Sequence, residues 1–152
     1  MDRTVPPPWT AMRVDASTVR LWAREVALGA NGLPARIQTL DVPVLAAPAT
    51  ITASTPAGAL TLVGSGVTFT ETADDRVAWR ASLSGGGIRA ELAARMEFDG
   101  LLYCAINLLP ESGAAARIDG LHIDFPMNPH HAAQLIANGG GKSFRSSWVA
   151  RR

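Results

Sequence analysis

The sequence predicts an all-β fold, an antiparallel β-sandwich of about nine or ten strands with one short C-terminal helix. Several short segments alternate apolar and polar residues, which is the period of a half-buried strand. Glycine-rich, Asn-Gly and Asp-Gly reversals separate these segments at spacings typical of hairpins. At 152 residues, the chain has the size of one domain or of a piece of a larger protein.

The chain begins with a proline-rich tail. Residues 1–8 include three consecutive prolines, and we expect them to be extended and flexible. Residues 9–152 then form the sandwich domain, which we expect to be incomplete at its C-terminal end. Residues 1–9 have no apolar signal core, so the sequence indicates no secretory leader and assigns no cellular location.

The first half of the domain predicts short strands and tight turns. Residues 19–28 and 35–45 predict two strands, joined by the Asn31-Gly32 reversal, a strong hairpin signal. Residues 51–54 predict a short strand. Gly64-Ser65-Gly66 separates two further apolar segments, and we interpret it as another reversal.

The longest alternation covers residues 88–98. It follows a strand predicted at residues 77–83 and the turn Gly85-Gly86-Gly87. Apolar side chains occupy every second position, and the intervening residues are charged except for Ala93. A helical period would scatter the apolar residues around the cylinder, so the pattern predicts a strand in spite of good helix formers.

Asp99-Gly100 ends this strand, and the pairing of side chains predicts the type of turn. A two-residue turn would place charged residues opposite apolar ones, which is an unfavourable pairing. One additional residue pairs Phe98 with Leu102 and Met96 with Cys104, so that one face becomes apolar. We therefore predict that Gly100 has a positive φ in a three-residue turn or a bulge.

The last predicted strand covers residues 118–125 and ends at Pro126. Asn128 is a suitable cap for a short helix over residues 129–136, with Pro129 at its favoured first position. Four aromatic residues lie on the apolar phases of their strands and are candidates for the core: Phe69, Trp79, Phe98 and Phe125.

Composition argues against several function classes. The chain carries 14 basic and 13 acidic residues, so no strong field attracts nucleic acid or a membrane surface. No apolar run of roughly 18 residues is present to cross a membrane. Charged residues make up only 18%, which suggests that part of the surface meets another domain. The single cysteine, Cys104, lies in an apolar run and is predicted to be a buried thiol rather than a nucleophile.

Two glycine-rich stretches fail as nucleotide-binding motifs. Gly139-Gly140-Gly141-Lys142-Ser143 lacks the earlier glycine of a phosphate loop, because Ile136 stands there. Gly64-Ser65-Gly66 lacks the third glycine of a dinucleotide fingerprint, because Phe69 stands there. We therefore expect no cofactor.

The three histidines do not form a convincing metal site. His130 and His131 are adjacent and would point about 100° apart on a helix, and no cysteine or carboxylate stands at ligand spacing from them or from His122. We expect surface histidines and no metal.

No catalytic residue is assigned. Glycoside hydrolysis usually requires two carboxylates at a fixed separation, and nothing distinguishes a functional pair here. The pairs considered are Asp74 with Asp75, Glu97 with Asp99, and Asp119 with Asp124. Asp99 is interpreted as a turn former. No Ser-His-Asp arrangement carries a nucleophile elbow.

Tryptophan offers a possible sugar contact, because exposed indole rings stack on sugar rings. Trp9, Trp22 and Trp148 belong less clearly to the core than Trp79 does. Packing in the core or between domains is favoured for each, and the residues that would bind a substrate stay unknown.

Several motifs together resemble the N-terminal β-sandwich domain of proteins like glycoside hydrolase family 123. The resemblance covers roughly residues 19–137. The motifs are Asn31-Gly32-Leu33-Pro34-Ala35, Val44-Leu45-Ala46, Glu97-Phe98-Asp99-Gly100-Leu101, Ile123-Asp124-Phe125-Pro126-Met127 and Ala132-Ala133.

The resemblance implies a function that composition does not give. Members of that family pair the sandwich with a catalytic barrel and remove β-linked N-acetylgalactosamine, with the substrate acetamido group as nucleophile and an Asp-Glu pair on the barrel. Such hydrolases are usually exported. The barrel is absent from this chain, so no catalytic residue carries over. The expected role is a non-catalytic accessory sandwich, not an enzyme by itself, whose partner is the barrel or a glycan. The alternatives are an independent carbohydrate-binding domain and a structural interaction domain.

Overall fold

The computed structural model describes residues 4–111 and 116–130, and this part of the chain is all-β, as predicted. Within the described residues, twelve strands form three antiparallel sheets. The five-stranded sheet contains β1 (Arg13–Asp15), β2 (Thr18–Leu21), β3 (Arg24–Leu28), β4 (Pro34–Thr39) and β5 (Val42–Pro43). The four-stranded sheet contains β8 (Val63–Thr72), β9 (Arg76–Gly85), β10 (Ile88–Glu97) and β11 (Leu102–Pro110). The three-stranded sheet contains β6 (Thr50–Thr55), β7 (Gly58–Thr61) and β12 (Gly120–Asp124).

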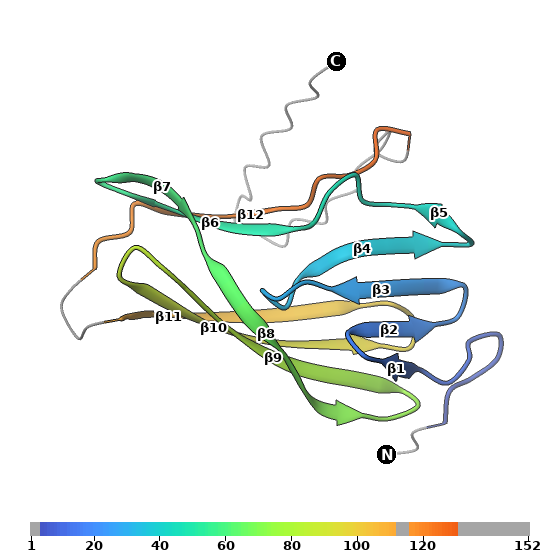
Figure 1. The fold of residues 1–152 in the computed structure, drawn as a ribbon. Helices are drawn as coiled ribbons and strands as arrows, with labels where there is room; N and C mark the ends of the chain where they lie inside the picture. Colours follow the sequence, from blue (N-terminus) through green and yellow to red (C-terminus); the bar gives the residue numbers. More distant parts are fainter. Residues whose placement is uncertain (1–3, 112–115, 131–152) are drawn as a thin grey trace, which may run out of the picture.

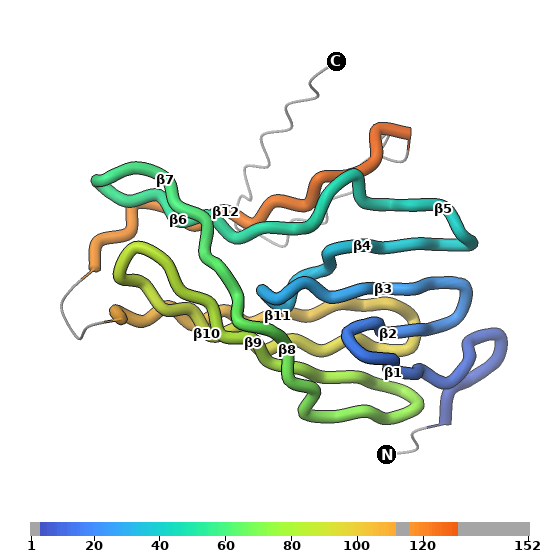
Figure 2. The backbone as a smooth tube through the Cα atoms, viewed as in Figure 1, coloured from blue at the N-terminus to red at the C-terminus, as the bar shows by residue number. Residues whose placement is uncertain are grey.

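The sheets are arranged as a sandwich around one core. The four-stranded sheet forms one layer, and the other two sheets face it (Figure 1). Strand β8 carries the chain from the three-stranded sheet to the four-stranded one (Figure 2). Side chains from all three sheets are buried together because alternate residues of each strand point inward. The main members are Val19, Val26, Leu33, Ile51, Ala53, Val77, Trp79, Leu83, Ile88, Leu92 and Met96.

Two segments predicted as single strands are each divided by a turn, which partly explains why there are more strands than the predicted nine or ten. Residues 19–28 form β2 and β3, with Ala23 at φ 56° between them. Residues 35–45 contain most of β4 and all of β5, with positive φ at Leu40 and Asp41 between them. The buried positions change from odd numbers in β2 to even numbers in β3, and this phase change is the sequence signal of the first turn.

The predicted reversal at Gly64-Ser65-Gly66 is wrong, because β8 continues through it with a shift in its pairing with β9. The physical reason is a close approach of two backbones. A Cβ atom on Gly64 would collide with the backbone of Ala30, and the amide of Gly66 donates a 3.0 Å hydrogen bond to the Ala30 carbonyl. These glycines allow another turn to cross the strand.

The predicted turn at Gly100 is confirmed. The amide of Glu97 donates a 3.0 Å hydrogen bond to the Leu101 carbonyl, which leaves residues 98–100 as a three-residue turn, and Gly100 has a φ of 91°. Asp99 is the turn former that was expected, because its Oδ1 accepts a 2.9 Å hydrogen bond from the amide of Leu101.

The exact pairing of this hairpin differs from the prediction by two residues. Met96 pairs with Leu102 and Ala94 with Cys104, where Phe98 with Leu102 was expected. Apolar residues still oppose apolar residues, because a shift of two positions leaves every side chain on its original face.

The C-terminal helix predicted over residues 129–136 lies mostly outside the described residues. Its first residues form a turn in which Asn128 Oδ1 accepts a 3.2 Å hydrogen bond from the amide of His130, which is the capping contact expected of Asn128. No helix among the residues described is long and apolar enough to cross a membrane.

Candidate functional site

The carboxylates considered for catalysis lie in two places. The amide of Phe98 donates a 3.0 Å hydrogen bond to the Asp75 carbonyl, so the turn with Asp74 and Asp75 lies beside the turn with Glu97 and Asp99. Asp119 and Asp124 lie at the two ends of β12, in another sheet. Glu97 forms an ion pair with Arg95 at 3.7 Å, and Asp119 forms one with Arg117 at 2.8 Å. Asp124 lies exposed on β12. Within residues 4–111 and 116–130, no group of three His, Cys, Asp or Glu side chains is placed to hold a metal ion.

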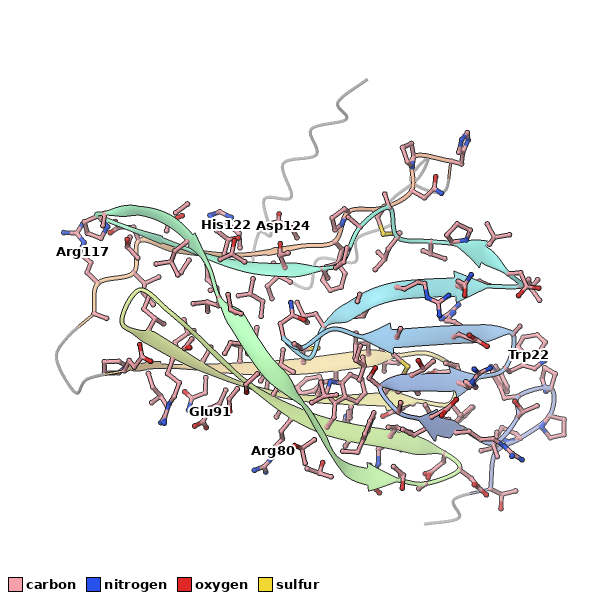
Figure 3. All side chains as sticks on the ribbon, in the orientation of Figure 1. Trp22, Arg80, Glu91, Arg117, His122 and Asp124 are labelled. Carbon is pink, nitrogen blue, oxygen red and sulfur yellow. The ribbon has the colours of Figure 1, made fainter. Side chains whose placement is uncertain are left out.

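The histidines and the glycine-rich loop are only partly described. His122 and Asp124 point away from the four-stranded sheet (Figure 3). His130 is exposed in the turn after Asn128. His131, the stretch of residues 139–143 and Trp148 lie outside the described residues.

Cys104 lies on the inner face of β11 and is half-buried rather than fully buried, as an edge-strand residue would be. Burial raises the pKa of the Cys104 thiol above its ordinary value. A thiol that resists ionisation is a weak nucleophile, so the environment of Cys104 favours a structural role.

The described aromatic side chains do not form a row on one face. Trp22 is exposed in the turn between β2 and β3 (Figure 3). The ring of Trp9 contacts the edge of Phe98 at a centroid distance of 5.5 Å. Tyr103 is exposed on β11, and Trp79 is buried, as predicted. A platform of stacked aromatics for sugar binding is therefore absent from the part of the chain that the structure describes.

The outer surface of the four-stranded sheet instead carries a depression lined by polar and apolar residues, which we call the outer-face groove. It is open, has a volume of about 500 Å³, and crosses β9, β10 and β11. A smaller hollow of about 220 Å³ continues it toward β8. The outward-facing residues that line the groove are Arg80, Ser82, Glu91, Ala93, Ala105 and Asn107.

Strand register explains the shape of the groove. Glu91 pairs with Ser82 on one side and Asn107 on the other, so these three side chains form one row across the sheet. In the next row, Ala93 lies between Arg80 and Ala105. The two alanines form a low floor because their side chains end at Cβ, and the longer residues form the walls.

Charge on this face is mostly paired. Arg89 forms an ion pair with Glu91 at 3.5 Å, and Arg95 forms one with Glu97. Arg95 also lies over the ring of Tyr103, 5.1 Å from its centroid. Arg80 has no hydrogen-bond or ion-pair partner among the described residues, and it lines both the groove and the smaller hollow. Of the two charged side chains that line the groove, Arg80 and Glu91, only Arg80 lacks an ion-pair partner among the described residues.

A second surface, which we call the β12 strip, consists of Leu121, Ile123 and Phe125. Leu121 pairs with the buried Ala53, and Ile123 pairs with the buried Ile51, so the strip continues the inner face of the sheet. The strip is nevertheless 37–42% exposed. Phe125 was predicted to lie in the core, and this is wrong because no described element of the opposite layer covers it.

Strand β12 is also a sheet edge. It pairs with β6 and with no other strand of the described chain. Just beyond it, Met127 forms an isolated bridge with Leu45, and the amide of Asn128 donates a 2.8 Å hydrogen bond to the Val44 carbonyl. The strip is therefore held just beyond the C-terminal end of β12, while its apolar side stays open.

Sequence reasoning missed both surfaces for different reasons. The sequence showed which side chains of β9 and β10 point outward. The groove also depends on which residues lie beside each other on neighbouring strands. The alternation of residues 121–125 was readable as well, but alternation marks an apolar face without stating whether another layer covers it.

Comparison with known families gives one match. The model of a family described as glycoside hydrolase 123, third domain, matches residues 12–148. The match confirms the family resemblance and does not confirm the N-terminal position that the resemblance implied. No curated protein matches the chain.

Proposed function

This chain belongs to the glycoside hydrolase 123 family, whose third-domain model it matches, and we propose that it is a non-catalytic accessory domain that supports a catalytic barrel. The proposed activity of the complete enzyme is removal of β-linked N-acetylgalactosamine, as the resemblance implies. In this proposal the acidic residues that perform the chemistry lie on the barrel.

The β12 strip is the observation that carries the proposal. An apolar strip that continues a core and yet faces solvent is unfavourable, since burying apolar surface gains roughly 25 cal/mol per Å². The three large apolar side chains of this strip share one face at a sheet edge whose outer side pairs with no described strand. Such an edge also invites uncontrolled pairing with other chains unless something covers it. A neighbouring domain of the same enzyme would satisfy both needs.

The distribution of polar side chains on β12 supports an interface on the apolar side of the strand. The opposite face of β12 carries His122 and Asp124, which point outward (Figure 3). Only the side bearing Ile123 is suited to a dry interface. The proposed interface therefore uses one side of the strand and leaves the other in water.

The test needs the catalytic barrel of a protein of this family. The barrel would be produced with the full chain, and their association would be measured by calorimetry. We expect Ile123→Asp to weaken association at least tenfold, because it places a charge in an apolar interface. Leu40→Asp is the matched control, since Leu40 is 74% exposed on a different surface.

Two results would contradict the proposal. Equal association of the Ile123→Asp variant and the unchanged chain would remove the β12 strip as the interface. Hydrolysis of an aryl β-N-acetylgalactosaminide by the purified chain alone would show that it is an enzyme without the barrel. Thermal unfolding of each variant alone would show whether a loss of association comes from a loss of folding.

A further inference from the structure

We propose that the outer-face groove binds a saccharide that carries an acidic group, either a carboxylate or a sulfate. This inference is independent of the proposed association with a barrel, because the groove and the β12 strip lie on different sheets. It assigns a ligand to a surface that the accessory role does not use.

The size and position of the groove fit a small ligand. Its volume of about 500 Å³ falls in the range of ligand sites, roughly 300–1,000 Å³. The groove crosses β9, β10 and β11, and the backbone groups of β9 and β10 at its centre are already paired with neighbouring strands. Recognition at the centre of the groove must therefore come from side chains.

The side chains around the alanine floor offer both hydrogen-bond donors and hydrogen-bond acceptors, which sugar hydroxyl groups require. Glu91 accepts hydrogen bonds, Asn107 both donates and accepts, and the hydroxyl of Ser82 does both. The register places these three groups in one row across three strands. Below them, the methyl groups of Ala93 and Ala105 provide a shallow apolar floor for the C–H face of a sugar ring.

Arg80 is the reason why we propose that the saccharide carries an acidic group. The other two arginines of this part of the sheet, Arg89 and Arg95, each have a carboxylate partner. Arg80 stands without one among the described residues, at the junction of the groove and the smaller hollow. A guanidinium presents paired N–H donors that match a carboxylate or sulfate, so the charge that completes this site is an anion.

The smaller hollow extends the site along the same line. It is lined by Arg80, Ser82 and, on β8, Ser65 and Thr68. Gly66 adds no side chain there, so the hollow stays open. The ligand that fits both depressions is longer than one ring and runs across the strands, with its acidic group near Arg80.

Calorimetric titration of the full 152-residue chain would test this with three trisaccharides: oligogalacturonate, sulfated galactotriose and uncharged galactotriose. We expect one of the two acidic ligands to bind at least tenfold more tightly than the uncharged one, with shifts of the amide resonances confined to β8–β11. Which acidic ligand binds would distinguish carboxylate from sulfate. Binding should weaken as salt increases, because an exposed charge pair is screened.

Two variants test the roles of charge and shape. Arg80→Gln should weaken binding of the acidic ligand about tenfold, whereas Arg13→Gln, an exposed arginine on the other layer, should leave binding unchanged. Ala105→Leu should fill the floor and abolish binding of every ligand. Both groove residues are exposed, so we expect both variants to fold, and circular dichroism would verify it.

The proposal would be overturned if none of the three saccharides bound, if the uncharged ligand bound as tightly as the acidic ones, or if Arg80→Gln bound as well as the unchanged chain. Binding of an acidic peptide with equal strength and the same shifts would also overturn it, since the site would then read charge alone.

Discussion

The indole Nε1 of Trp79 donates a 2.8 Å hydrogen bond to the backbone carbonyl of Gly32. Gly32 lies in the turn between β3 and β4, and Trp79 points inward from β9, so the bond joins two layers through the core. Asn31 anchors the same turn, with its Nδ2 donating to the Ala49 carbonyl at 2.8 Å and its Oδ1 accepting from the Leu33 amide at 3.0 Å. The Asn-Gly turn is therefore both a hairpin connection and a tether between sheets.

Replacing the indole should destabilise the domain. Trp79→Phe removes the donor, leaves the Gly32 carbonyl without its partner, and reduces the volume that fills the core. We expect a loss of about 3 kcal/mol in the free energy of unfolding. Urea titration followed by circular dichroism measures it. Trp22→Phe, at an exposed site, should change stability by less than about 0.5 kcal/mol.

Substitution of Gly32 should destabilise the domain through backbone strain and through crowding. Comparison with Gly87 separates the two effects. Gly32 has a φ of 78°, and an added Cβ would lie 2.9 Å from the side chains of Ala81 and Leu92. Gly87 has a φ of 77° with nothing near an added Cβ. We expect Gly87→Ala to cost about 1 kcal/mol from backbone strain and Gly32→Ala about 3 kcal/mol from strain and crowding. Equal losses in thermal unfolding would show that crowding is unimportant.

Gly100→Val should destabilise the hairpin of β10 and β11. A β-branched residue is strongly disfavoured at a φ of 91°, and its Cβ would press on the guanidinium of Arg24. We expect a loss of about 2–3 kcal/mol, and a smaller one for Gly100→Asn, because asparagine tolerates positive φ. An unchanged melting temperature for the valine variant would contradict this account of the turn.

Cys104 should make stability fall at high pH. Burial raises the pKa of its thiol in the folded chain, so the unfolded chain releases the proton first as pH rises. Stability linked to this group is complete below the ordinary thiol pKa, ~8.5, and declines above it. Between pH 7 and 10, the unchanged chain should therefore lose more unfolding free energy than Cys104→Ala, as measured in urea. Parallel losses would show that the thiol is not responsible.

Local sequence patterns were sufficient to predict most of the strands and one turn. The alternation at residues 88–98 predicted β10, and charge opposite apolar side chains predicted the positive φ of Gly100. These succeeded because strand faces and turn conformations depend on residues close in sequence. The reversal predicted at Gly64-Ser65-Gly66 failed because those glycines accommodate Ala30, which lies far away in the sequence.

By itself, the sequence determined the β-sandwich class, the inward face of most strands, the turn at Asp99-Gly100 and, through its motifs, the family. Only the tertiary structure decided the exact register of β10 against β11, because a shift of two residues preserves every face. It also decided that Arg80 lies beside an alanine floor and that Phe125 stays exposed. The alternation of side chains along a strand sets which way a residue points. Which residues lie beside it, and whether another layer buries it, depend on strands brought together from distant parts of the chain.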